Sequence, residues 1–156
     1  YTNVKFRPAQ GEINTHSVGA ACSYPLMRVE EMYFIEAEAA ERVAAGTGIA
    51  LLENFMKTYR DKNYTYTGTD AIDEIIFQKR IELWGEGQSF FDIKRANLSV
   101  TRGYQDTNFF EDWRFNTNGR PAWMNFCIVS LEENDNPAVK GKNNPDPSRA
   151  YPLWKE

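Results

Sequence analysis

Apolar residues recur at helical spacing between residues 28 and 45. At about 100° of rotation per residue, these side chains fall on one side of the expected helix. They are Val29, Met32, Tyr33, Ala37, Ala40, Val43 and Ala44. Pro25 precedes the pattern and Gly46 follows it, and both residue types are typical of helix boundaries. The pattern therefore predicts a helix over residues 28–45.

A second apolar pattern begins after the short segment GTG. Residues 49–62, IALLENFMKTYRDK, place Ile49, Leu52, Phe55, Met56 and Tyr59 on one side of a helix. Because the link is so short, the two helices must run antiparallel. The small alanines of the first helix should let the second helix approach closely, so we predict a helical hairpin.

Another pair of helices is predicted further along. Thr69 or Asp70 can cap a third helix, which runs to about Trp84. The GEG segment at residues 85–87 interrupts this helix, and residues 88–97 resume the pattern as a short fourth helix. Two hairpins in series favour a mainly α fold of tetratricopeptide-like hairpins, although the second is not a recognisable repeat of the first.

The segments that flank this helical core, residues 25–98, have a different character. Residues 1–24 are rich in small polar residues and predict an extended, mostly irregular lead-in. Residues 99–156 are rich in Asn, Asp, Pro and aromatic residues without a helical period, which predicts an irregular tail. We expect the tail to lie over the helices as long aromatic-rich loops, held there by Phe109, Phe110, Trp113, Trp123, Phe126 and Tyr151.

The third helix carries apolar residues on two nearly opposite sides. One side holds Ile72, Ile75, Ile76 and Leu83, and the other holds Phe77, Ile81 and Trp84. A helix of this kind is buried between two neighbours. Lys79 falls within the first stripe, and Arg80, Glu82 and Glu86 fall on its flanks. Since burial of an unpaired charge would be prohibitive, we expect these groups to be paired.

Two further charge pairs are expected from helical phase. Glu36 projects into the middle of the apolar face of the first helix, so it should take a cation from a neighbouring helix. Lys79 or Arg80 is the expected source of this cation. Arg95 lies one turn after Asp92 and can form a local pair with it.

The carboxylates Glu82 and Glu86 raise the alternative of a catalytic pair, as in a glycosidase. Such a pair must flank a substrate across a cleft, whereas neighbours one turn apart on a helix point the same way and repel. The spacing therefore favours a structural role, and we do not expect an enzyme. The GEG segment likewise lacks the spacing and the Lys-Ser or Lys-Thr pair of a phosphate-binding loop.

Composition narrows the possible partners. The net charge of -4, with acidic and basic residues interspersed, gives no basic stripe for nucleic acid. No apolar run is long enough to span a membrane, and the start of the chain does not resemble a signal peptide, so any export signal should lie outside it. His16 is the single histidine, and Cys22 and Cys127 can form a disulfide or remain buried thiols. We expect neither a metal nor a cofactor.

Two segments carry a resemblance to a known family. YPLMRVEEMYFIEAEAAERVAAG, followed by IIFQKRIELWGEGQSFFDIKRANL, strongly resembles the carboxy-terminal part of SusD/RagB-like proteins, the surface nutrient-binding lipoproteins of Bacteroidetes. The matching positions are Arg28, Glu38, Ala39, Arg80, Glu82, Leu83, Glu86, Gly87, Phe91, Asp92 and Arg95. The closing YPLWKE is also similar to a segment near the end of these proteins, while Gln78 and Lys79 replace an acidic-arginine pair that is frequent in the family.

The resemblance implies a helical, tetratricopeptide-containing protein that is not an enzyme. Such a protein caps a SusC-like TonB-dependent outer-membrane transporter and captures oligosaccharides or polysaccharide fragments at the cell surface. This chain would then be a carboxy-terminal portion of a larger domain, whose lipid anchor lies outside it. The motif also adds Arg28 and Glu38 to a structural charge network with Glu36, Lys79, Arg80, Glu82, Glu86, Asp92 and Arg95. A protein-interaction module without direct sugar contact is the alternative.

A sugar site, if this chain holds one, is expected in the segment FFEDWRFNTNGRPAW. Sugar rings stack their apolar faces on flat aromatic side chains, and their hydroxyls bond polar side chains. Trp113, Phe115 and Trp123 are the candidate platforms, and Arg114, Asn116 and Asn118 are the candidate polar partners. The alternative is that these aromatics anchor the tail to the core.

Overall fold

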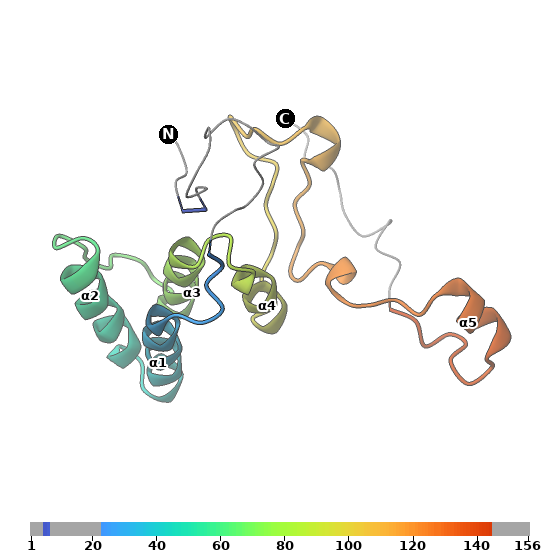
Figure 1. Ribbon diagram of the computed structural model, residues 1–156, viewed down its shortest axis with the longest axis horizontal. Coiled ribbons are helices and arrows are strands. Elements are labelled where there is room, and N and C mark those ends of the chain that lie inside the picture. The colour runs from blue at the N-terminus through green and yellow to red at the C-terminus, as the bar shows by residue number, and fades with distance from the viewer. Residues whose placement is uncertain (1–4, 7–22, 145–156) are drawn as a thin grey trace. The chain divides into compact units, whose positions relative to one another are not determined.

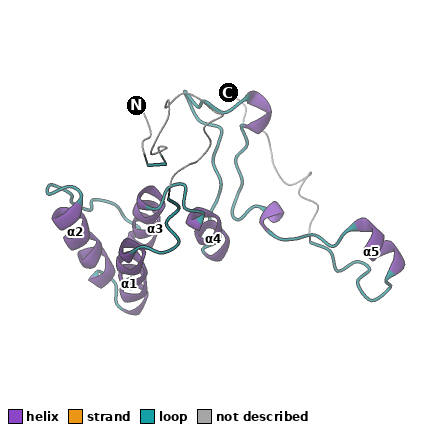
Figure 2. Cartoon of the chain, in the orientation of Figure 1, coloured by secondary structure: helices purple, strands orange, loops and turns teal. Residues whose placement is uncertain are grey.

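The computed structural model describes residues 5–6 and 23–144, and helices are the regular secondary structure of these ranges (Figure 2). The predicted mainly α class is confirmed. The chain divides into two compact units, Tyr1–Gly87 and Gln88–Glu156. The division falls at the predicted GEG break, so the two helices of the predicted second hairpin belong to different units. Most of the predicted lead-in, His16, Cys22 and the closing YPLWKE lie outside the described residues.

Unit 1 contains α1 (Val29–Val43), α2 (Thr47–Tyr59) and α3 (Ala71–Glu82), shown in Figure 1. All three helices begin and end within one turn of the predicted positions. Asp70 is the N-cap of α3, because its side chain accepts a hydrogen bond of 2.9 Å from the backbone N–H of Asp73. The cap resolves the choice between Thr69 and Asp70.

The link between α1 and α2 brings the two helices into very close contact. Gly46 has a φ of 87°, a left-handed conformation that glycine adopts without strain. Gly48 is buried, and a Cβ atom added there would lie 2.0 Å from the carbonyl oxygen of Ala37. The Glu41 carboxylate accepts hydrogen bonds from the N–H groups of Gly46 and Ile49, and these bonds lower its pKa. The hairpin is therefore closed by backbone contact and by a carboxylate at the start of α2.

The core of unit 1 is formed by Phe34, Ala37, Leu52, Phe55 and Ile75. The predicted phase of the first helix is partly wrong: Val29, Met32, Tyr33 and Val43 are exposed, whereas Phe34 is 1% exposed. Aromatic and aliphatic residues also lie on the exposed surface of α1, so apolar residues alone do not mark its buried side. The direction of burial is set instead by the contacts of α1 with both α2 and α3.

The predicted burial of α3 is confirmed on one side only. Ile75, Ile76 and Leu83 are buried, but Phe77, Ile81 and Trp84 are each more than half exposed. Within unit 1, α3 packs its first stripe on α1 and α2, and its second stripe faces outward. The prediction of two buried faces is therefore wrong for the described residues.

Unit 2 consists of short elements joined by long loops. It contains α4 (Gln88–Arg95), the 3-10 turns η2 (Glu111–Trp113) and η3 (Ala122–Met124), and α5 (Ser130–Asp135). The prediction of a tail without helix is wrong at α5. The aromatic residues predicted as anchors, Phe109, Phe110, Trp113, Trp123 and Phe126, are exposed, and Tyr151 lies outside the described residues. Cys127 is a free, exposed thiol, which neither predicted alternative describes.

Candidate functional site

A cluster of opposite charges joins the ends of the three helices of unit 1. We name it the charge hub, formed by Lys5, Arg28, Glu30, Arg60, Glu82 and Glu86. Arg28, just before α1, lies 3.0 Å from the carboxylate of Glu82 and 3.1 Å from that of Glu86. Arg60, just after α2, donates to both carboxylate oxygens of Glu82, at 2.7 and 2.8 Å. The hub thus ties all three helices together at one end.

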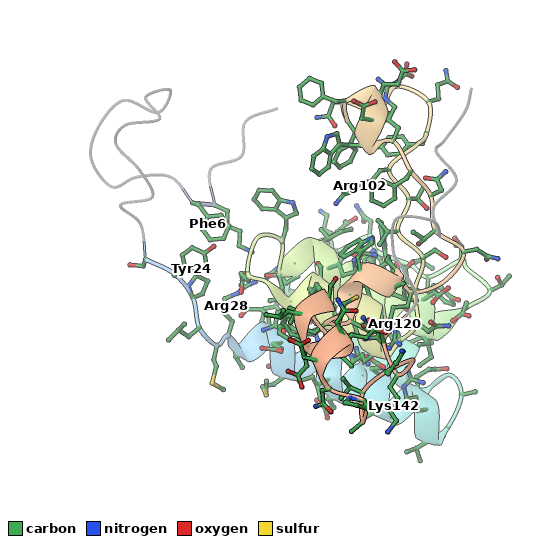
Figure 3. The ribbon with its side chains drawn as sticks, turned by 90° about the vertical axis from the view of Figure 1, so that its right-hand side faces the viewer. Phe6, Tyr24, Arg28, Arg102, Arg120 and Lys142 are labelled. Carbon is green, nitrogen blue, oxygen red and sulfur yellow. The ribbon has the colours of Figure 1, made fainter. Side chains whose placement is uncertain are left out.

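Residues from the amino-terminal segment lie in and beside the charge hub. Lys5 pairs with Glu86 and donates to the carbonyl oxygen of Glu82 at 2.9 Å. Phe6 stacks on Tyr24 with ring centroids 5.4 Å apart, and Figure 3 shows both rings near Arg28. The side chain of Glu86 is 6% exposed, so its charge is compensated by Arg28 and Lys5 rather than by water.

Acid is expected to weaken the charge hub. The hydrogen bond from Arg60, supported by those from Arg28, holds the pKa of Glu82 below its ordinary value of 4.5 against the opposing effect of burial. A carboxyl with a lowered folded-state pKa stabilises the fold above its unfolded-state pKa, and this gain is lost as pH falls through the folded-state pKa. The free energy of unfolding should therefore decrease as pH falls below about 4.5.

Urea denaturation at stepped pH values measures this effect. Glu82→Gln should show a shallower decrease than the wild type, because glutamine does not titrate. Some slope should remain, since the pKa values of Glu41 and Glu53 are also lowered, by backbone hydrogen bonds and by Lys57 respectively. Equal slopes in the two proteins would contradict the role given to Glu82.

The other predicted charge-network residues lie in separate places. Glu38 is 6% exposed and pairs with Arg42 one turn away, at 2.7 Å. Asp92 and Arg95 form the predicted local pair, at 2.8 Å. Lys79 is buried, as is Nε of Arg80, which has no hydrogen-bond partner among the described residues. The prediction that Glu36 lies within the buried face of the first helix is wrong. Its side chain is exposed, because the predicted phase of that buried face is wrong.

The predicted sugar-binding residues lie in unit 2, in a segment that we name the aromatic loop, residues 99–123. Its two arms meet at an isolated antiparallel bridge between Thr101 and Asn116. The Asn116 side chain accepts hydrogen bonds from the N–H groups of Arg102 and Gly103 and donates to the Gly103 carbonyl, at 2.9 to 3.0 Å. The buried Thr117 hydroxyl accepts from Val100 N–H at 2.8 Å. These bonds fix the base of the loop.

Arg102 lies between two aromatic rings of the aromatic loop. Its guanidinium carbon is 5.1 Å from the ring centroid of Phe109 and 4.8 Å from that of Phe115, and both distances are typical of cation–π contacts. Arg114 donates to the Phe109 carbonyl at 2.7 Å. Figure 3 shows Arg102 with aromatic side chains around it. The loop is therefore held by polar and cation–π contacts instead of by aromatic burial.

The six predicted sugar-binding residues divide into two groups. Asn116, Phe115 and Arg114 take part in the contacts that shape the loop. Trp113, Asn118 and Trp123 are exposed, with 59% of Trp113 and 38% of Trp123 accessible to solvent. Sequence reasoning assigned Phe110 to anchoring the tail and did not single out Tyr104, although both are exposed, and it missed the organising role of Arg102. No periodic pattern marks Arg102, because its ring partners lie in different parts of a loop.

The exposed indoles can stack against flat apolar surfaces, and the neighbouring amides and guanidinium groups can bond hydroxyls. Among the described residues, no group of three or more His, Cys, Asp or Glu side chains is placed to bind a metal ion. None of the helices in the described ranges is long and apolar enough to cross a bilayer. The chemistry offered by the aromatic loop is therefore stacking and hydrogen bonding.

Comparison with known proteins gives two matches that agree with each other. The model of the SusD family matches residues 1–136. A SusD-like carbohydrate binding protein from Bacteroides vulgatus, whose crystal structure is known, shares 28% sequence identity with this chain. The two structures align with a TM-score of 0.57. The alignment covers 84% of this chain and 31% of that one, so the chain spans about a third of that protein. No curated protein matches the sequence.

Proposed function

This chain belongs to the SusD family, and we propose that it binds glycans through the exposed aromatic residues of its aromatic loop. We further propose that the full-length protein works at the outer-membrane surface with a SusC-like TonB-dependent transporter. Its attachment there would use a lipid anchor rather than a membrane-spanning helix. The ligands would be oligosaccharides or polysaccharide fragments, bound without chemical change.

The observation that carries the proposal is the exposure of Trp113 and Trp123 on a loop with a fixed base. A large aromatic side chain left open to solvent gains apolar contact when a sugar ring stacks on it. Because Asn116 and Thr117 hold the loop in place, little conformational entropy is lost on binding. Asn118, which is also exposed, supplies an amide for sugar hydroxyls.

Two facts support this assignment. The similar protein from Bacteroides vulgatus is a carbohydrate binding protein. The carboxylates that could have formed a catalytic pair, Glu82 and Glu86, are both bonded to arginine within the charge hub. Carboxylates held in this way stabilise a fold and do not flank an open cleft, which favours binding without catalysis.

Trp113→Ala and Trp123→Ala are each expected to weaken glycan binding roughly ten-fold, because each variant removes one stacking surface. Both variants should remain folded, with the smaller loss of stability for Trp113→Ala, because 59% of Trp113 but only 38% of Trp123 is exposed. Calorimetric titration with a glycan selected from an oligosaccharide array measures the affinity, and thermal denaturation measures the stability. Trp84→Ala, which removes a similarly exposed indole from unit 1, is the matched control and should bind normally. A collapse of the melting temperature in the Trp113 or Trp123 variant would identify core residues.

A protein-interaction role without sugar contact is the second candidate function. It is favoured by an outward apolar stripe, formed by Phe77 and Ile81 of α3 and by Trp84 just after this helix, all of which are exposed. Exposed apolar patches frequently mark protein contacts. Capture of the transporter from outer membranes, with and without oligosaccharide, separates the two roles. A pure interaction module would bind no sugar and would capture the transporter equally well in both conditions.

A further inference from the structure

The seam between α1 and α2 carries an open groove in unit 1. Its volume is about 210 Å³, and its lining consists of Tyr33, Glu36, Leu51, Asn54, Phe55, Thr58 and Tyr59. A second hollow of about 150 Å³ continues it toward Arg60 and shares Tyr33, Phe55 and Tyr59. We name the first hollow the seam groove. Figure 1 shows the two helices that form it side by side.

Aromatic rings form the floor and walls of the seam groove. Phe55 is 4% exposed and forms the floor. The rings of Tyr33 and Tyr59 lie 5.3 and 5.5 Å from that of Phe55, centroid to centroid, and 6.0 Å from each other. Both tyrosine side chains remain substantially exposed. A hydrogen bond with Tyr59 is the main cause of the raised pKa of Tyr33.

The rim of the seam groove is polar and free to bind. Glu36, Asn54 and Thr58 contribute a carboxylate, an amide and a hydroxyl, none of which is hydrogen-bonded or ion-paired in the described part of the chain. Together they offer both donors and acceptors above a flat aromatic wall. This combination suits a ligand that has an apolar face and several hydroxyls.

Size and charge decide between the possible ligands. Sites for drug-sized molecules usually measure about 300–1,000 Å³, so a groove of about 210 Å³ is suited to a single small ring. A cationic side chain would be attracted by Glu36. However, the guanidinium of Arg60 already lies 5.2 Å from the Phe55 ring in the adjoining hollow and would repel it. A neutral, polyhydroxylated ring avoids this repulsion and uses every rim group.

We propose that the seam groove is a second subsite, which holds one pyranose ring of a neutral glycan. The ring stacks on Tyr33 and Tyr59, and its hydroxyls bond Glu36, Asn54 and Thr58. This proposal rests on the proposed glycan-binding function but concerns a different unit of the chain. Binding here does not require Trp113 or Trp123.

Calorimetric titration of the full chain with maltohexaose, cellohexaose and xylohexaose tests the proposal. Glu36→Ala and Tyr59→Ala should each weaken binding of the recognised oligosaccharide roughly ten-fold, through loss of a charged hydrogen bond and of a stacking surface. Tyr59→Phe keeps the ring and should bind within a few-fold of the wild type. Glu31 lies on α1 outside the seam groove, so Glu31→Ala is the matched control. Thermal denaturation checks that each variant is folded.

The outcomes separate this proposal from the proposed function. If Trp113→Ala weakens binding while Glu36→Ala and Tyr59→Ala do not, the seam groove is not a subsite and the aromatic loop remains the glycan site. If groove variants and loop variants all bind like the wild type, both proposals are wrong. If the wild type binds none of the neutral oligosaccharides, the seam groove proposal is overturned. Capture of a protein on this face that sugar does not affect also overturns it.

Discussion

Arg28→Ala is expected to lower the free energy of unfolding by about 3 kcal/mol, because it takes the guanidinium partner from the buried Glu86 and one of two arginine partners from Glu82. Arg28 lies just before α1 and bonds Glu82 and Glu86, whose side chains are 15% and 6% exposed. Removing one member of a buried ion pair costs far more than the pair itself contributes, since the remaining charge is desolvated and uncompensated. Glu86 would retain only Lys5 in the hub.

Urea denaturation followed by circular dichroism measures this loss. Arg28→Lys should recover only part of it, because an ammonium group cannot reproduce the separate contacts that the guanidinium makes with two carboxylates. Lys57→Ala is the matched control: it breaks an exposed pair with Glu53 one turn away and should leave stability nearly unchanged. Equal stability of Arg28→Ala and Lys57→Ala would show that the charge hub does not hold the helices together.

Gly48→Ala is expected to destabilise the protein by about 2–3 kcal/mol, although alanine is the better helix former. The added methyl group would lie 2.0 Å from the carbonyl oxygen of Ala37 and 2.6 Å from Cβ of Glu41. A backbone oxygen cannot rotate away as a flexible side chain can, so α2 must separate from α1. This separation would open the core around Phe34 and Leu52.

Ala50→Gly is the control for Gly48→Ala. Ala50 is exposed in the same helix, so its replacement reveals the helix-propensity effect alone, a loss of about 1 kcal/mol or less. Thermal and urea denaturation of both variants give the comparison. If Gly48→Ala stabilises the protein, propensity outweighs the close packing of the hairpin, and the account of the seam between α1 and α2 is wrong.

The helices and their ends could be predicted because local signals specify them. The cap at Asp70, the break at the glycines and the close approach of the hairpin each depend on residues near in sequence. Which side of a helix is buried depends instead on the position of its neighbours. Glu36 shows the difference: it falls among apolar residues on a helical projection, but in the structure it is exposed at the edge of the contact between α1 and α2.

The charge hub and the aromatic loop were only partly predictable for a related reason. Arg28, Glu82 and Glu86 stand out in the sequence, but Arg60 follows α2 with no local sign that it reaches Glu82. In the aromatic loop, Asn116 has the residue type of a sugar ligand and instead fastens the backbone. Residue type indicates the chemistry that a side chain can perform, whereas its hydrogen-bond partners depend on the folded structure.

The most direct test of glycan binding by the aromatic loop uses the four tryptophans of the chain as reporters. Each indole N–H gives one signal in a proton–nitrogen spectrum, and single Trp→Phe variants assign these signals. During titration with a glycan that the wild type binds, the signals of Trp113 and Trp123 should shift and reach saturation. The signal of Trp84 should stay in place. If Trp113 and Trp123 do not move at saturating glycan, the sugar is not bound by the aromatic loop.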